Sequence, residues 1–175
     1  MSGLFFAVFP DSPAKACIHC LAKVVKCAHH FDGKLTEPDR LHATLFFLGD
    51  SALDRIVRMA CEAAREVRML PFDVSFDRIA SFRGGSKGHP FVLLGDDGLI
   101  RLKQFRQALG AAMTRNGLRR LVTTDFNPHV TLLYDRRNVE ERPIESISWR
   151  VGEFVLVYSF DKKHEYLARW PLRVE

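Results

Sequence analysis

The sequence predicts an α+β protein assembled from a duplicated unit, and three observations lead to this prediction. The motif His-x-Thr-Leu occurs twice, at residues 42–45 and 129–132, and the two copies start 87 residues apart in a chain of 175. From the composition only about 0.03 copies are expected by chance. Short apolar stretches typical of strands recur in both halves, and segments with helical periodicity separate them.

The first half of the chain has the pattern strand, helix, strand, helix, strand. The expected elements are a strand at 4–9, a helix at 14–28, the first motif strand at 41–48, a helix at 51–67 and a strand at 72–76. Asp11 or Ser12 can cap the first helix, which Pro13 is suited to begin. Ser51–Asp54 has a capping-box pattern that opens the second helix, with Leu53 on its apolar face.

The second half repeats this order and then diverges. The expected elements are a strand at 91–94, a helix at 97–116, the second motif strand at 129–134 and two closing strands at 154–160 and 166–170. Asn116 and Gly117 are a good stop for the helix. Residues 135–148 have mixed charge and a proline, which does not favour a long helix. The turn at 161–164 places His164 in solvent.

The glycine-rich stretch Arg83–Gly88 is the natural boundary between two lobes, roughly 1–88 and 89–175, of one bilobal domain over 1–175 with possible strand exchange. Its glycines suggest a phosphate cradle, but the spacing of a P-loop is missing, so we interpret it as a surface loop. His89 beside it is expected to be solvated.

The cysteines raise the possibility of a metal site. Cys17, Cys20 and Cys27, followed by two histidines, superficially resemble zinc ligands. On a helix, however, the three thiols and Val24 form one apolar stripe, and thiols on such a stripe are usually small core residues. We therefore expect neither a metal nor a disulfide, the latter because a reducing compartment disfavours it.

The composition indicates a globular soluble protein with an anionic partner. Hydrophobic residues make up 47% and charged residues 27% of the chain, and the formal net charge is +5. No apolar run reaches the roughly 20 residues of a membrane span. Residues 4–9 lack a basic leader and end at Pro10, so they are interpreted as a strand and not as a signal peptide. A cytoplasmic location without membrane contact is the expectation.

Alternation along the two motif strands assigns their side chains to faces. His42, Thr44 and Phe46 share one face of the first strand, and His129 and Thr131 share one face of the second. If an approximate two-fold relates the halves, the pairs meet across one cleft. A neutral and a protonated imidazole can then act as base and acid at a phosphorus atom, while hydroxyls hold its oxygens, without a metal. The alternative is two core histidines on ordinary strands.

The stretches Leu41–Gly49 and Pro128–Leu132 resemble the paired His-x-Thr motifs of the two-histidine phosphoesterases. More narrowly, they resemble the RNA 2′,3′-cyclic phosphodiesterases once named 2′-5′ RNA ligases. Residues 4–8, the strand after Pro71 and the tail 154–172 also resemble this family, so the likeness covers nearly the whole chain. It implies two antiparallel sheets that face a central cleft, with helices on the outside.

The resemblance also implies a reaction, the hydrolysis of an RNA-terminal 2′,3′-cyclic phosphate to a 2′-phosphomonoester without metal or cofactor. In that scheme His129 accepts a proton from water and His42 donates one to the departing 3′ oxygen. Thr44 and Thr131 bind the phosphate. The implied partner is an RNA or nucleotide with such an end, and we expect a monomer.

The chain departs from the family at Tyr134, where an arginine is often found. Arg136 and Arg137 are therefore candidate substrate contacts that could supply the missing cation. Tyr134 and Phe46 could stack on a base or pack in the core.

Three alternative functions remain open at this stage. The same fold could bind a nucleotide without catalysing its reaction, although a binding module has no chemical need for a matched acid and base. It could join 2′,5′ ends, although hydrolysis should dominate in water and ligation would then be a side activity. The repeats could also be only core strands of an interaction protein.

Overall fold

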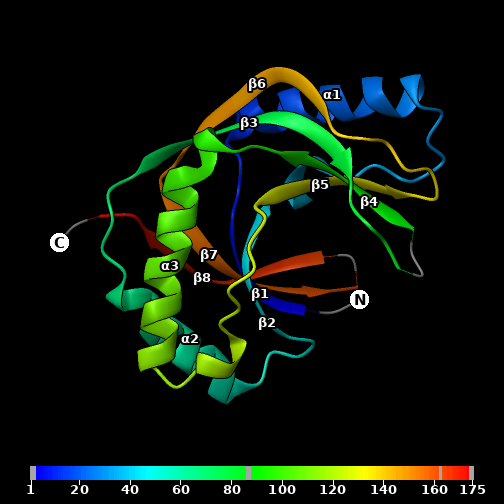
Figure 1. Cartoon of the computed structure of the whole chain (residues 1–175). Helices are drawn as coiled ribbons and strands as arrows, with labels where there is room; N and C mark the ends of the chain where they lie inside the picture. The colour runs from blue at the N-terminus through cyan, green and yellow to red at the C-terminus, as the bar shows by residue number, and fades with distance from the viewer. Residues whose placement is uncertain (1–2, 86–87, 162, 174–175) are drawn as a thin grey trace.

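The computed structural model describes residues 3–85, 88–161 and 163–173 (Figure 1). Strands and helices mix along these residues, which confirms the predicted α+β class. The strands are β1 (Gly3–Val8), β2 (Ala43–Gly49), β3 (Phe72–Ser81), β4 (His89–Leu94), β5 (His129–Asp135), β6 (Arg142–Val151), β7 (Glu153–Phe160) and β8 (Lys163–Pro171). The helices are α1 (Ser12–Ala28), α2 (Asp54–Glu66) and α3 (Ile100–Arg115), with short 3-10 turns η1 (Pro38–Arg40), η2 (Asp97–Leu99) and η3 (Arg119–Leu121).

All described strands belong to one antiparallel sheet in the order β6-β3-β4-β5-β2-β1-β7-β8. Two facing sheets were expected, whereas the described strands form one sheet whose two halves of four strands meet through a single residue pair, Ala43 with Val130, where β2 meets β5. The facing arrangement stays a prediction. The pairing exchanges strands between the chain halves, because β3 lies between β6 and β4 while β7 lies beside β1. The division into lobes at residue 88 stays a prediction.

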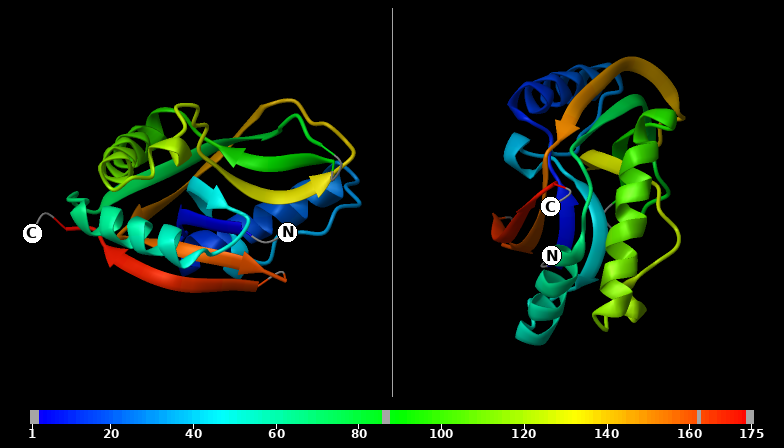
Figure 2. Two further views of the ribbon diagram at one scale, coloured as in Figure 1. Left: turned by 90° about the horizontal axis from the view of Figure 1, so that it is seen from below. Right: turned by 90° about the vertical axis from the view of Figure 1, so that its left-hand side faces the viewer.

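The helices pack on different strands of the sheet: α1 contacts β6 and β5, α3 contacts β3, and α2 contacts β8. Figures 1 and 2 show α1 beside β6, and α2 and α3 packed against each other at the opposite end. A shared core of buried aliphatic and aromatic side chains lies between these layers, including Phe6 from β1, Ile18 from α1 and Phe105 from α3. No helix in the described ranges is both long enough and apolar enough to cross a membrane.

The predicted start of α1 is confirmed, but its predicted buried face is wrong. Asp11 accepts a hydrogen bond from the Ala14 amide at 2.9 Å, and Pro13 lies in the first turn. The buried stripe consists of Ala14, Ile18, Ala22 and Val25. The stripe of Cys17, Cys20, Val24 and Cys27 faces solvent instead. The larger aliphatic side chains occupy the core, since their burial removes more apolar surface from water than the burial of thiols does.

The other two helices differ in how well their ends were predicted. α2 begins at Asp54, so Ser51 lies two residues before the N-cap position and the expected capping box does not form. Leu53, expected on the apolar face, is 60% exposed. The end of α3 is confirmed, because Gly117 has a φ of +83° and the Leu118 amide donates to the Met113 carbonyl at 2.9 Å.

The glycine-rich stretch connects two paired strands, β3 and β4. Gly88 adopts a φ of +93°, which favours glycine, and residues 86 and 87 lie outside the described ranges. His89 begins β4 and is half-buried, with Nδ1 3.1 Å from the Phe82 carbonyl, so its predicted solvation is wrong. β6 was missed by the sequence pattern because it is an edge strand that tolerates Pro143.

Candidate active site

The two His-x-Thr motifs meet at the joint between the sheet halves. Ala43 in β2 pairs with Val130 in β5 in an antiparallel ladder. Extending this register by one residue in each direction aligns His42 with Thr131 and Thr44 with His129. Because the side chains of neighbouring residues point to opposite faces of a strand, all four of these side chains lie on the face opposite to the side chains of Ala43 and Val130.

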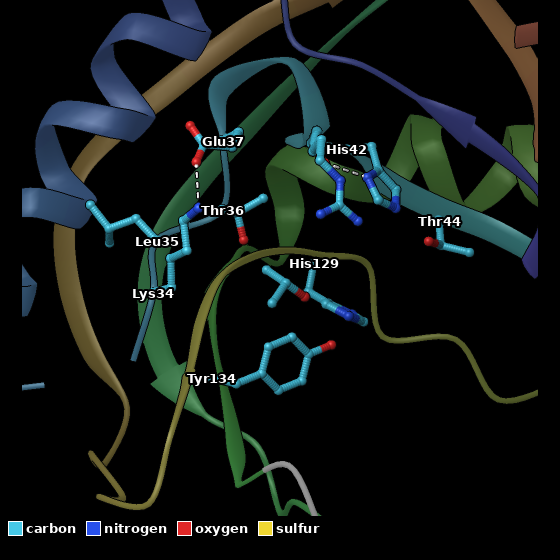
Figure 3. A pocket seen from close by; sticks show the side chains of 10 residues that line it. Lys34, Leu35, Thr36, Glu37, His42, Thr44, His129 and Tyr134 are labelled. Atoms are coloured by element: carbon cyan, nitrogen blue, oxygen red, sulfur yellow. Dashed lines mark hydrogen bonds and ion pairs between the residues drawn. The ribbon is translucent and has the colours of Figure 1, made fainter. Parts of the chain in front are cut away.

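These four side chains line one cavity of about 470 Å³. Figure 3 shows His42 and Thr44 on one wall and His129 and Tyr134 on the other, with the segment 34–37 closing one side. The full lining consists of Lys34, Leu35, Thr36, Glu37, Arg40, His42, Thr44, His129, Thr131 and Tyr134. The structure thus brings together residues from η1, β2, β5 and the connection after α1.

The segment that forms this side wall is tied to β5 by main-chain contacts. Leu35 pairs with Leu133, and the Thr36 amide donates to the Leu132 carbonyl at 2.7 Å. The buried carboxylate of Asp135 accepts from the amides of Asp32 at 2.6 Å and Gly33 at 2.8 Å. Burial raises the pKa of this carboxyl group, but the amide hydrogen bonds outweigh burial and hold the pKa below its usual value.

A β-bulge in β2 separates Phe46 from the histidine face, so its predicted position is wrong. Ala7 of β1 pairs with Thr44 and Phe6 pairs with Phe46, which leaves Leu45 as the extra residue. Phe46 is therefore turned into the core at 3% exposure, and Phe47 is the exposed residue of the pair, at 53%.

Arg106 of α3 explains why the bulge is stable. It is buried, its Nε donates to the Leu45 carbonyl at 2.9 Å, and its guanidinium lies 4.1 Å from the centre of the Phe46 ring. The main-chain acceptor that the bulge frees is thus satisfied by a side chain of the helix.

Both cavity histidines are held by the same kind of hydrogen bond. Nδ1 of His42 lies 2.6 Å from the Arg40 carbonyl, and Nδ1 of His129 lies 2.8 Å from the Asn127 carbonyl. A carbonyl oxygen can only accept, so Nδ1 carries the proton in both rings. The neutral form of each ring therefore has an unprotonated Nε2, which can accept or relay a proton.

Burial makes the two histidines unequal. It lowers the pKa of His42 to about 4, although the bond to the Arg40 carbonyl opposes this, and the nearby positive charges of His164, Arg40 and His129 lower it further. Burial also lowers the pKa of His129, again against its carbonyl bond. His42 is the more perturbed ring, and its imidazolium is the stronger acid of the two.

His164 was predicted to be solvated in a turn, and this prediction is wrong. It lies in β8 opposite Ser159, and its ring meets that of His42 edge to face with centroids 5.1 Å apart. Burial lowers its pKa to about 4, assisted by the charge of Arg40. His164 is cross-strand to Ser159 only because of the register in which β7 and β8 pair, and the sequence does not specify that register.

Tyr134 lies between the histidine cavity and a neighbouring one. It lines both, and the second cavity, of about 610 Å³, also contains Arg136 and Arg137. Arg137 forms an ion pair with Asp32 at 3.0 Å. The two arginines proposed from the sequence therefore lie around the adjacent cavity, and only Tyr134 reaches the histidines.

The described residues around this site do not meet the requirements of a metal centre. Within residues 3–85, 88–161 and 163–173, no group of three or more His, Cys, Asp or Glu side chains is placed to hold a metal ion. The polar groups that the cavity offers are imidazoles, hydroxyls, a carboxylate and two cations, Lys34 and Arg40. Such a set can bind an anion and move protons.

Comparison with known protein families matches residues 4–163 to the model of the 2′-5′ RNA ligase superfamily. The RNA 2′,3′-cyclic phosphodiesterase of Archaeoglobus fulgidus is 30% identical over 100 residues, which cover 57% of this chain and 54% of that protein. The chain therefore aligns with about half the length of this curated relative.

Solved structures agree with this match over almost the entire chain. The crystal structure of a phosphoesterase is similar with a TM-score of 0.73 and 26% identity, covering 99% of both chains. LigT of E. coli in complex with 3′-AMP has a TM-score of 0.70 and 27% identity, covering 98% of both. TT0787 of Thermus thermophilus, at 24% identity and a TM-score of 0.76 over 99% of both chains, shares the fold.

Proposed function

The chain belongs to the 2′-5′ RNA ligase superfamily, and we propose that it hydrolyses the 2′,3′-cyclic phosphate at an RNA end to a 2′-phosphomonoester. The observation that carries this proposal is the single cavity lined by His42, Thr44, His129 and Thr131, with the Nδ1 of both rings fixed by a carbonyl. A general acid and a general base on opposite walls are what an in-line displacement at phosphorus requires.

In the proposed reaction, His129 takes a proton from water as the water oxygen bonds to phosphorus. The bond between phosphorus and the 3′ oxygen breaks, and His42 gives its proton to that oxygen. The difference in pKa supports this division of roles, because the more buried His42 is the stronger acid and the less perturbed His129 the better base. The anionic phosphodiester favours the imidazolium of His42 in the complex.

Thr44 and Thr131 are the proposed phosphate-binding residues. Each hydroxyl lies two residues after a histidine on the same strand face. It can therefore donate a hydrogen bond to a non-bridging oxygen while the histidine transfers a proton to the bridging oxygen or from the water. These neutral donors become more effective as charge develops on the oxygens in the transition state.

Turnover of an oligoribonucleotide that ends in a 2′,3′-cyclic phosphate tests this proposal. Mass spectrometry is expected to show the gain of one water, and a phosphatase-free digest is expected to release a nucleoside 2′-phosphate. A protein that binds the oligonucleotide without changing its mass would be a binding module, and release of the 3′-phosphate would reverse the proposed leaving group.

The path of the RNA is proposed to run past Tyr134. Its side chain is 47% exposed and borders both the histidine cavity and the cavity of Arg136 and Arg137. A nucleotide that precedes the cyclic phosphate can stack on the ring, and the next phosphate can meet the arginines.

Replacing Tyr134 with alanine is expected to raise KM for a cyclic-phosphate trinucleotide by roughly 5- to 150-fold, since one stacked base contributes roughly 1–3 kcal/mol. Tyr134→Phe retains the ring and should behave like the wild type. The matched control is Phe160→Ala, which removes an aromatic side chain that is 63% exposed on β7 and lines neither cavity. Equal KM values for Tyr134→Ala and the wild type would exclude this path.

A further inference from the structure

We propose that Arg40 is the cation that binds the non-bridging phosphate oxygens of the substrate and offsets the charge that they gain in the transition state. This proposal rests on the proposed function and names a further residue of the same site. Arg40 ends η1, two residues before His42, and its side chain lines the cavity together with both histidines and both threonines.

The guanidinium of Arg40 has no anionic partner in the described part of the chain. Among the residues that the structure describes, no carboxylate forms an ion pair with Arg40, and its Nε is buried without a hydrogen-bond partner. A buried donor of a guanidinium without an acceptor is costly, so it indicates a site where an acceptor binds. The other lining cation, Lys34, pairs with Glu37 at 3.3 Å, and its side chain is 88% exposed.

The influence of Arg40 on its neighbours locates its charge. Burial is the main cause of the lowered pKa of His42 and of His164, and the guanidinium of Arg40 lowers both further. The positive charge therefore lies close to the ring that is proposed to donate the proton. A phosphate bound between Arg40 and His42 would replace this repulsion by two favourable contacts, because the anion attracts the guanidinium and the imidazolium alike.

The chemistry of the guanidinium fits this position better than that of the available alternatives. Its planar fork donates two parallel hydrogen bonds to two oxygens of one phosphate group. The hydroxyls of Thr44 and Thr131 are neutral, and Tyr134 on the facing wall carries no charge. Arg137 is committed to Asp32 and borders the neighbouring cavity. Besides the imidazolium of His42, Arg40 is thus the lining cation that no carboxylate among the described residues neutralises.

The side chain of Arg40 can be tested without disturbing the fixed ring of His42, because that ring is bonded to the Arg40 main-chain carbonyl. Arg40→Gln removes the charge and is expected to lower kcat/KM for a cyclic-phosphate oligoribonucleotide by about 10²–10³-fold, the usual effect of losing one transition-state donor. Arg40→Lys keeps the charge but loses the fork, so its kcat/KM should fall between the two.

Binding of 2′-AMP, measured by calorimetry, is a second readout that needs no turnover. Arg40→Gln is expected to weaken it by about tenfold or more, as for the loss of a charge-assisted hydrogen bond. The matched control, Arg115→Gln, removes the same charge from the exposed end of α3, where Arg115 pairs with Glu66 at 2.8 Å, and should leave 2′-AMP affinity within about threefold of the wild type. Adding Tyr134→Arg to Arg40→Gln returns a cation to the cavity and should restore part of the lost affinity for 2′-AMP, which has no preceding nucleotide to stack on Tyr134.

Three results would overturn the assignment of Arg40. The first is that the wild-type protein does not bind 2′-AMP, and the second is that Arg40→Gln leaves both kcat/KM and 2′-AMP affinity unchanged. The third is that Arg40→Gln lowers the urea midpoint of unfolding and its losses follow from that lower stability. A wild-type protein that binds 2′-AMP through Arg40 but leaves the cyclic phosphate intact would instead refute the proposed hydrolysis and retain the phosphate site.

Discussion

Replacing either His42 or His129 with alanine is expected to lower kcat for hydrolysis of an RNA-terminal 2′,3′-cyclic phosphate by about 10²–10⁴-fold. A positioned acid or base contributes rate enhancements of this size. Each variant removes one of the two proton-transfer steps and leaves the threonine hydroxyls and the cavity in place. KM should change much less than kcat, because the lost interaction is made mainly in the transition state. Initial rates by chromatography of the phosphomonoester product would measure both constants.

The double variant separates a cooperative pair from two independent contacts. If the two rings act on one phosphorus atom, His42→Ala combined with His129→Ala should cost little more than the worse single variant, since residues that work as a unit are far from additive. His30→Asn is the matched control, because this exposed residue has a φ of 52° that asparagine tolerates. Full turnover in either single alanine variant would refute the acid-base scheme.

The meeting of the two motifs could be predicted from the sequence because it depends on local rules. Alternation puts each histidine and its threonine on one face, and a single antiparallel pair, Ala43 with Val130, is enough to bring the two faces together. The end of α3 was likewise predictable, because a glycine directly after the last turn of a helix is a local signal.

The errors came from features that depend on tertiary partners. The bulge at Leu45 reverses Phe46 and Phe47 and is stabilised by Arg106, 61 residues away. His164 was misplaced because the strand β8 begins at Lys163, which shortens the turn and fixes a register that the sequence does not specify. The exposed thiols of α1 had helical spacing, but Ile18 and Val25 on the opposite stripe compete more strongly for the core. In each case the missing information was the identity of the neighbour.

The cluster of His42, His164 and Arg40 has a consequence for stability as well as for catalysis. The rings of His42 and His164 meet edge to face, both lie against Phe5 and Phe9, and neither has a carboxylate partner among the described residues. Burial lowers the pKa of each ring to about 4. In an unfolded chain both would ionise near their ordinary value of about 6.5.

Acidification from about pH 6.5 to about pH 4 is therefore expected to destabilise the fold. In this window the unfolded chain binds more protons than the folded one, so the free energy of unfolding falls as the pH falls, and these two rings add no pH dependence above about 6.5. His42 alone accounts for up to about 3 kcal/mol at the acidic end, and the two rings do not simply add because they repel each other when charged. Urea unfolding followed by tryptophan fluorescence at about pH 7 and about pH 4 measures this loss.

The double variant His42→Asn with His164→Asn lacks both titrating rings. It should therefore lose less stability between the two pH values than the wild type does. Part of the slope remains, because carboxylates such as Asp135 and the ring of His129 also have shifted pKa values. His30→Asn again serves as the control and should keep the full wild-type slope. An unchanged slope in the double variant would mean that the two rings are solvated in the folded protein, and the buried acid of the proposed mechanism would then lose its physical basis.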